Sequence, residues 1–240
     1  MEHFDEMGDI FKRIVRARGW LGTTVDVRVK NLTAEEAIGH PEHDDYPLIK
    51  GRERMMEADF LGSRGQAFTD MYGEYSGTVA EVCDMRPENN FRRAIYIATL
   101  NAVARHMGLV SSTVHCKNDE PPLCAKELVQ YIHQSYGRPK VALVGLQPRM
   151  VEALGRNFEL RVTDMDADNV GTIKFGTKIE GPEKTMDNLA WCDLALVTGT
   201  TLTNNSIPEF LNGKPAIFYG VTIAGPALFL NLTRFCPYGS

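Results

Sequence analysis

The chain has 240 residues, of which 43% are hydrophobic and 24% are charged, and its formal net charge is −5. This composition is typical of a globular protein with one large domain or two small ones. The acidic balance argues against nucleic acid as a main partner, because phosphate binding requires a basic face. The sequence has no run of about 18 apolar residues, which argues against a membrane partner.

The cysteines and the N-terminal residues indicate in which cellular compartment the protein is expected. The chain has five scattered cysteines, an odd number: Cys83, Cys116, Cys124, Cys192 and Cys236. Such a set favours reduced thiols over a disulfide framework. The opening Met-Glu-His-Phe-Asp-Glu is acidic and lacks the basic region of a signal peptide. We therefore expect a cytoplasmic protein, and the sequence leaves open whether it forms a homo-oligomer.

The first half of the chain mixes helical and strand periods, which predicts an α+β domain. Apolar residues recur at helical spacing over 4–17 and alternate over 24–30. Further extended segments are expected at 56–60, after a turn within 62–70, and at 75–82. A helix is expected from Asn89 or Asn90 to about Met107, with Gly108 as its stop.

The second half alternates apolar runs with helical stretches. Strands are expected near 141–145, 159–164, 193–198 and 215–220, and helices near 124–136, 148–156, 183–191 and 206–211. Strands alternating with helices predict an α/β domain with a parallel, Rossmann-like sheet. The change of period places the domain boundary near residue 110, dividing the chain into 1–110 and 111–240.

A polar turn follows the strand near 193–198. It reads Thr198-Gly199-Thr200-Thr201-Leu202-Thr203-Asn204-Asn205-Ser206. Ligands of open α/β sheets bind at the carboxyl ends of strands, and a helix start near Ser206-Ile207-Pro208 would offer backbone donors to an anion. A capped strand-to-helix connection would use some of these groups, but their density exceeds what capping requires. We predict ligand contacts from Thr200, Thr201 and Asn204.

The turn after the strand near 141–145 resembles a nucleotide-binding turn only in part. Gly145 supplies just the first glycine of a dinucleotide fingerprint, and Pro148 removes a backbone donor, so conventional NAD or FAD binding is not expected. Asp164 nevertheless ends the next strand, where a ribose-binding acid sits in nucleotide-binding folds. It could equally cap the turn that follows, so both interpretations remain open.

A histidine and two cysteines lie close together in the sequence. His115, Cys116 and Cys124 could supply three of four ligands to a divalent transition metal such as zinc, and Asp119 and Glu120 could add oxygens. The spacing is not that of a zinc knuckle. The alternative is that both cysteines are small buried residues beside a helix start.

Three segments resemble a known family. They are Asp45-Tyr46-Pro47-Leu48-Ile49-Lys50-Gly51-Arg52-Glu53, Gly65-Gln66-Ala67-Phe68-Thr69-Asp70 and Val197-Thr198-Gly199-Thr200-Thr201-Leu202-Thr203-Asn204. In this order they resemble the putative heavy-metal chelation family, a domain of unknown function, over nearly the whole chain. The resemblance implies an enolase-N-terminal-like α+β domain before a Rossmann-like domain, with the site in the cleft between them. Residues 220–226 depart from the family's Gly-Pro-Ser-Thr-like segment, so no site residue is carried over there.

We therefore expect the chain to bind a small anionic or metal-chelating ligand in an interdomain cleft, linked to heavy-metal handling. Thr200, Thr201 and Asn204 would contact the ligand from the Rossmann-like side. Gln66 and Thr69 would contact it from the facing domain. The alternatives are an enzyme that holds a nucleotide-like cosubstrate through Asp164, a metal-binding or metal-delivery protein working through the histidine and cysteines, and a non-catalytic scaffold.

Overall fold

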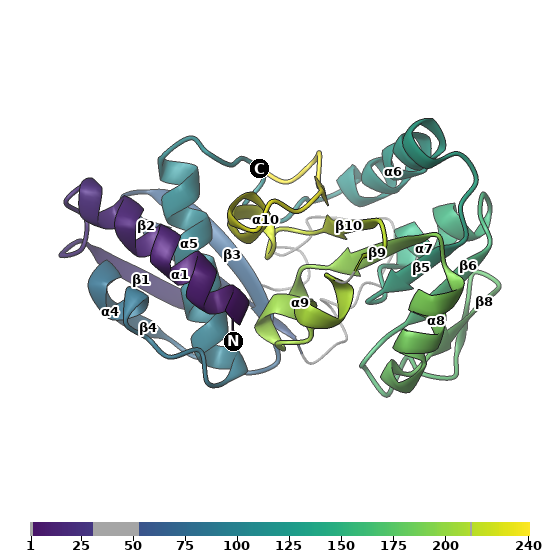
Figure 1. Ribbon diagram of the computed structural model, residues 1–240, viewed down its shortest axis with the longest axis horizontal. Coiled ribbons are helices and arrows are strands. Elements are labelled where there is room, and N and C mark those ends of the chain that lie inside the picture. The colour runs from purple at the N-terminus through teal and green to yellow at the C-terminus, as the bar shows by residue number, and fades with distance from the viewer. Residues whose placement is uncertain (1, 31–52, 212) are drawn as a thin grey trace.

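The structure is a computed structural model that describes residues 2–30, 53–211 and 213–240. Two β-sheets dominate it, and they stand at the left and the right of Figure 1 with helices α9 and α10 between them. Within the described ranges, no helix is both long and apolar enough to cross a membrane.

The first sheet has four antiparallel strands in the order β3-β2-β1-β4. They are β1 (Thr24–Lys30), β2 (Arg54–Phe60), β3 (Ser63–Thr69) and β4 (Tyr75–Thr78), accompanied by helices α1 (Glu2–Ala17), α4 (Val79–Cys83) and α5 (Asn90–His106). The predicted strand at 75–82 is wrong beyond Thr78. There Thr78 and Glu81 cap each other's backbone N–H groups, and this capping box starts α4 instead.

Helix α5 is the central element of the first half. Asn89 caps it by accepting a hydrogen bond from the Arg92 backbone N–H, as the sequence predicted. Every residue over 93–104 is buried, because the helix is covered by β2 and β3 on one side and by α9 and α10 on another. Gly65 permits the closest approach, since a Cβ atom there would lie 2.2 Å from the Ala102 nitrogen.

The second sheet has seven strands in the order β11-β10-β9-β5-β6-β8-β7. They are β5 (Val141–Val144), β6 (Leu160–Thr163), β7 (Ile173–Lys174), β8 (Thr177–Glu180), β9 (Leu194–Thr198), β10 (Ala216–Tyr219) and β11 (Arg234–Phe235). All neighbours pair in parallel except β7 and β8. The four predicted strands are confirmed as parallel. The other three have only two to four residues and lack a continuous apolar run.

Helices connect these strands. They are α6 (Glu120–Tyr136), α7 (Pro148–Gly155), η1 (Pro182–Lys184), α8 (Thr185–Trp191), α9 (Thr200–Thr203), η2 (Ile207–Phe210) and α10 (Ala224–Phe229). The α-helix expected to start at Ser206 is wrong. The backbone N–H and the hydroxyl of Ser206 both donate to the side-chain amide oxygen of Asn204, so the hydroxyl caps no helix and only the 3₁₀ turn η2 follows. The helical turn α9 begins directly after β9 instead.

The hydrophobic core lies on both faces of the second sheet. Ala142 and Val197 face a cluster that continues into the first half, where it contains Phe11 and Ile97. The neighbouring residues Leu143 and Leu196 face a second cluster beneath α6 and α7. This alternation is what extended strands produce. The apolar core is therefore continuous across residue 110.

Asn101 of α5 ties the two halves together. Its side chain is fully buried. The amide nitrogen donates to the backbone oxygens of Gln66 in β3 (2.9 Å) and of Val221 (3.1 Å) and Thr222 (3.2 Å) after β10. The amide oxygen accepts from the Gly225 N–H at 2.7 Å.

We expect Asn101→Ala to lower the free energy of unfolding by about 3 kcal/mol or more, because it leaves several buried backbone groups without partners. Urea denaturation of wild type and variant measures the difference. Asn157→Ala is the matched control, because Asn157 is exposed and bonds only within its own turn, to the Ala153 oxygen. Equal losses in the two variants would contradict the role given to Asn101.

Candidate functional site

A cavity of about 580 Å³ lies at the carboxyl ends of the central parallel strands. Five strand ends reach it: Gly145 after β5, Asp164 after β6, Thr198 of β9, Gly220 after β10 and Phe235 of β11. Glu53, Phe68 and Asp70 of the first half close it from the other side. The carboxyl edge is where open α/β sheets bind ligands. We call this cavity the cleft pocket.

Gly145 lets the strand ends converge at the floor of the cleft pocket. Its φ is +90°, and a Cβ atom would lie 2.8 Å from the Thr198 methyl carbon and 3.1 Å from the Tyr219 hydroxyl. The Tyr219 hydroxyl donates to the backbone oxygens of Val144 (3.0 Å) and Gly145 (2.8 Å). The glycine is therefore required here by the close packing of the strand ends.

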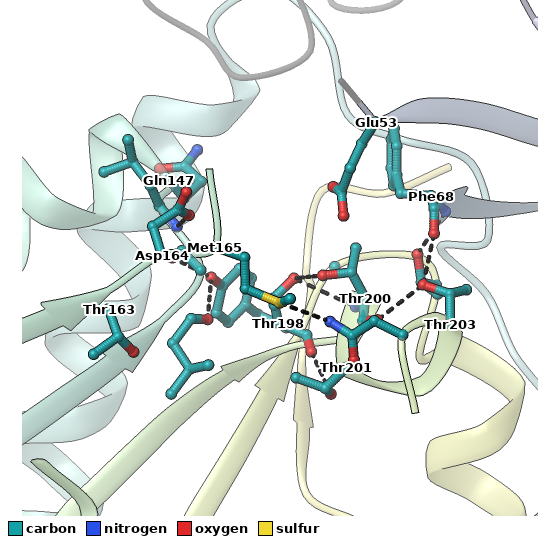
Figure 2. Close-up of a pocket in the computed structure, with 18 of the residues that line it drawn as sticks. Glu53, Phe68, Gln147, Thr163, Asp164, Met165, Thr198, Thr200, Thr201 and Thr203 are labelled. Atoms are coloured by element: carbon teal, nitrogen blue, oxygen red, sulfur yellow. Dashed lines mark hydrogen bonds between the residues drawn. The ribbon is translucent and has the colours of Figure 1, made fainter. Parts of the chain in front are cut away.

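The threonine-rich turn lines the cleft pocket, but several of its polar groups already have partners. The Thr201 hydroxyl donates to the Thr198 oxygen, and the Thr203 hydroxyl contacts the oxygens of Thr200 and Phe68, each at 2.8 Å. Figure 2 shows the Thr203 bond to Phe68 joining the two halves. Among the described residues, the Thr200 hydroxyl has one hydrogen-bonding contact, with the Thr198 hydroxyl at 3.3 Å. Thr200 is therefore the least engaged of the predicted ligand-binding hydroxyls.

Asn204 lines the cleft pocket and is half-buried. Its oxygen accepts from Ser206, and its amide nitrogen donates to the Met165 sulfur at 3.3 Å. This contact links the turn after β9 to the loop after β6. Asn204 therefore both stabilises its own turn and joins two walls of the pocket.

Asp164 also lines the cleft pocket, at the end of β6. One carboxylate oxygen accepts from the Leu146 N–H at 2.7 Å. The other accepts from the Asp166 N–H at 2.9 Å and the Asn169 amide at 3.2 Å. These bonds account for the capping interpretation, and the carboxylate still borders the cavity.

Carboxylates concentrate around the cleft pocket. Its described lining contains five acidic residues, Glu53, Asp70, Asp164, Asp166 and Glu209, and no lysine or arginine. Figure 2 shows Glu53 and Asp164 projecting into the pocket from opposite walls. The Glu53 side chain keeps contact with solvent, yet the surrounding walls raise its pKa to about 7, with Asp164, Asp70 and Asp166 adding to the effect. Sequence reasoning missed Glu53, although it ends one of the family-like segments.

His115, Cys116 and Cys124 all line the cleft pocket, together with Cys236, which was not predicted. Burial, and then neighbouring thiols, raise the thiol pKa values, that of Cys124 to about 12. His115 Nδ1 lies 2.6 Å from the Cys116 backbone oxygen; since a carbonyl only accepts, Nδ1 carries the proton. Burial lowers the pKa of this imidazole. Across the described part of the chain, no three His, Cys, Asp or Glu side chains are arranged to hold a metal ion.

Gln66 and Thr69 do not line the cleft pocket. The Gln66 amide donates to Glu57 at 2.7 Å and accepts from the His115 N–H at 2.8 Å, so it positions the segment that carries His115. The Thr69 hydroxyl bonds to the Met71 backbone. Because side chains alternate along a strand, the residues on either side of Thr69, Phe68 and Asp70, line the pocket in its place.

Glu53→Gln is expected to stabilise the unliganded protein above neutral pH. Because the native pKa of Glu53 is about 7 and the ordinary value is 4.5, the unfolded chain releases this proton first as pH rises. The wild type should therefore lose stability relative to the variant between about pH 4.5 and pH 7, and the gap should stay constant above that range. Melting temperatures of both proteins across this range measure the effect.

Glu74→Gln is the control for this prediction, because it removes the same charge at an exposed position outside the pocket. A gap between wild type and Glu53→Gln that does not change with pH would contradict the prediction.

The second half of the chain matches a known protein family, and the fold is similar to two solved structures. Residues 128–233 match the DUF364 family, described as "Putative heavy-metal chelation". The fold is similar to a DUF364 protein of unknown function from Pyrococcus horikoshii, with a TM-score of 0.54 and 13% identity over 92% of this chain and 79% of that one. It is also similar to a DUF364 protein of unknown function from Desulfitobacterium hafniense DCB-2, with a TM-score of 0.51 and 13% identity over 74% of this chain and 72% of that one.

No curated protein matches the sequence. At 13% identity, the two solved structures support the fold alone. Of the three family-like segments, 197–204 lies within the matched residues. Segments 45–53 and 65–70 precede the match, and residues 45–52 lie outside the part of the chain that the structure describes. The resemblance to the DUF364, putative heavy-metal chelation, family is confirmed over residues 128–233.

Proposed function

We propose that the chain binds a small metal-chelating molecule, or its metal complex, in the cleft pocket. The observation that carries this proposal is the pocket itself: about 580 Å³ at the carboxyl edge of five strands, walled from both halves of the chain. Pockets for small molecules typically measure about 300–1,000 Å³. A bare ion would need a compact ligand set, and the described residues offer none. The heavy-metal description of the family also supports a ligand that carries metal.

The charges of the described lining favour a metal-chelating ligand over a free anion. Five carboxylates repel an anionic molecule, and they would attract the positive charge of a bound metal. In this proposal, Thr200, Thr201 and Asn204 contact the ligand from the second half. Glu53 and Asp70 take the place expected for Gln66 and Thr69 on the facing wall.

The proposal also assigns a domain to each half of the chain. We propose an enolase-N-terminal-like domain over 1–110 and a Rossmann-like domain over 111–240, with the cleft pocket between them. The antiparallel first sheet and the mostly parallel second sheet support this division. The thiol corner, defined as His115, Cys116, Cys124 and Cys236, would lie nearest the metal of a bound complex.

An enzyme that uses a nucleotide-like cosubstrate is the second candidate function. It is favoured by Asp164, which ends β6 beside the Gly145 turn, the position of a ribose-binding acid in nucleotide-binding folds. The carboxylates of the described lining repel phosphate groups, so the cosubstrate would be a nucleoside that carries no phosphate. Stabilisation by adenosine, without any effect of metal chelates, would favour this candidate.

Thr200→Val tests the pocket as the ligand site. The nickel–histidine complex serves as the probe, and it should raise the melting temperature of the wild type more than nickel or histidine alone. The variant should bind the complex about tenfold more weakly, because one hydrogen bond is lost. Its own stability should change by less than about 1 kcal/mol, since the one hydrogen-bonding contact of that hydroxyl among the described residues is with Thr198.

Asn204→Ala should weaken the same binding, at a small cost to its turn. Asn157→Ala serves again as the control outside the pocket. If the complex leaves the melting temperature unchanged, or if Thr200→Val binds it as tightly as the wild type, the proposal fails.

The thiol corner should give a spectroscopic signal. If a thiol contacts the metal of the complex, it must lose its proton, and a sulfur-to-nickel charge-transfer absorption band should appear. The band should vanish in the Cys116→Ser, Cys124→Ser, Cys236→Ser triple variant and persist in Cys83→Ser, a control outside the pocket. One equivalent of nickel chloride giving the same band without histidine would favour a plain metal-binding protein instead.

A further inference from the structure

We propose that the ligand of the cleft pocket carries a protonated amine, and that this amine binds beside Glu53 and displaces the proton of its carboxyl group. The inference rests on the proposed function, whose pocket it uses, and it names the class of the ligand. The site itself is defined by the cavity at the strand ends. The Glu53 carboxylate favours a positively charged group of the ligand at this wall.

The described groups that face Glu53 are almost all acidic. Asp70 comes from the end of β3, and Asp164 and Asp166 come from the loop after β6. Tyr219 lies on the floor, but its hydroxyl hydrogen is directed at the backbone oxygens of Val144 and Gly145. It therefore does not serve as a donor to the Glu53 carboxylate.

The described basic groups near this wall are directed elsewhere. The Arg54 guanidinium bonds to the Glu53 backbone oxygen at 2.9 Å and lies over the Tyr72 ring. Arg93 donates to the Thr203 backbone oxygen at 2.6 Å. His115 lines the pocket, and burial lowers the pKa of its imidazole, so its neutral form is favoured. Within residues 53–211, the basic side chains near this wall thus leave the counter-charge of Glu53 to a ligand.

Without a bound cation, protonation neutralises the negative charge of the Glu53 carboxylate. Partial desolvation by the pocket walls, together with Asp164, Asp70 and Asp166, raises the Glu53 pKa to about 7, and a group with this pKa is about half protonated at neutral pH. An arriving ammonium group forms an ion pair with the carboxylate, and the displaced proton leaves to solvent. Each exchange brings in one positive charge and releases one, and no covalent bond changes.

An amine suits this wall better than a metal ion does. An ammonium group has three donors and no strict geometry, and Thr198 and Thr200 supply hydroxyl oxygens in the same pocket. A metal ion requires several ligands at fixed short distances, and the described side chains form no such group. Chelating molecules often combine amines with other donor atoms, so an amine is compatible with a metal-chelating ligand.

Titration calorimetry with putrescine tests the inference. Its two amines resemble the lysine amine in basicity and stay protonated over the range used. If binding requires ionised Glu53, the dissociation constant should be about tenfold lower at about pH 8 than at about pH 6, because the ionised fraction rises from about one tenth to about nine tenths. At neutral pH, about half a proton per bound molecule should be released, as measured in buffers of different ionisation enthalpy.

Glu53→Gln should bind putrescine at least about tenfold more weakly at about pH 8 and should lose the pH dependence. Glu74→Gln, which removes an exposed charge outside the pocket, should keep both the affinity and the pH dependence. Butanediol and succinate match putrescine in chain length, but butanediol is neutral and succinate is anionic. Neither should bind measurably.

Several results would overturn the inference. They are tighter binding of succinate than of putrescine, equal binding of putrescine by Glu53→Gln, and a Glu53-dependent pH profile for nickel chloride alone. If the nickel–histidine complex binds through Thr200 while putrescine neither binds nor competes, the amine inference fails and the proposed function stands. If neither probe binds, both fail.

Discussion

The Asn101 side chain is the contact on which the rest of the molecule depends. One buried amide in α5 bonds to the backbone of β3 and to the backbone after β10, so it joins the two sheets. A polar group at this depth is stable only with all its partners in place, which makes the joint specific as well as strong. Gly65 and Gly225 supply the space, because a Cβ atom at either would collide with α5. The relative position of the two sheets is thereby restricted.

The cleft pocket is a consequence of that joint and of the parallel register. Parallel strands end at one edge, and there the chain leaves the sheet through Gly145 and the threonine-rich turn. The first half supplies the opposite wall because α5 holds β3 beside α9, with Thr203 bonded to Phe68 across the boundary. Each wall alone would be an open surface. Together they form a cavity large enough for a small molecule.

The charge of the pocket gives that cavity a chemical character. Carboxylates brought together around the pocket repel one another, and this repulsion is one cause of the raised pKa of Glu53, about 7. Such an arrangement costs stability above neutral pH, and a positively charged ligand would relieve it. The thiol corner adds soft donors at a wall built from α6 and β11. The pocket therefore combines an acidic wall with thiol side chains.

The sequence by itself determined the elements whose signals are local. The alternation of β1, the Asn89 cap of α5 and the four apolar strands of the second sheet were all predicted, because periodicity and capping are properties of short segments. The threonine-rich turn was recognised for the same reason. Only the tertiary structure decided which residues share the pocket. Glu53 and Cys236 reach the pocket through long-range packing. Thr69 lies outside it because side chains alternate along β3, and Gln66 is held by a hydrogen bond from the His115 backbone N–H. Those outcomes depend on how α5 sets one sheet against the other, and no short stretch of sequence encodes that placement.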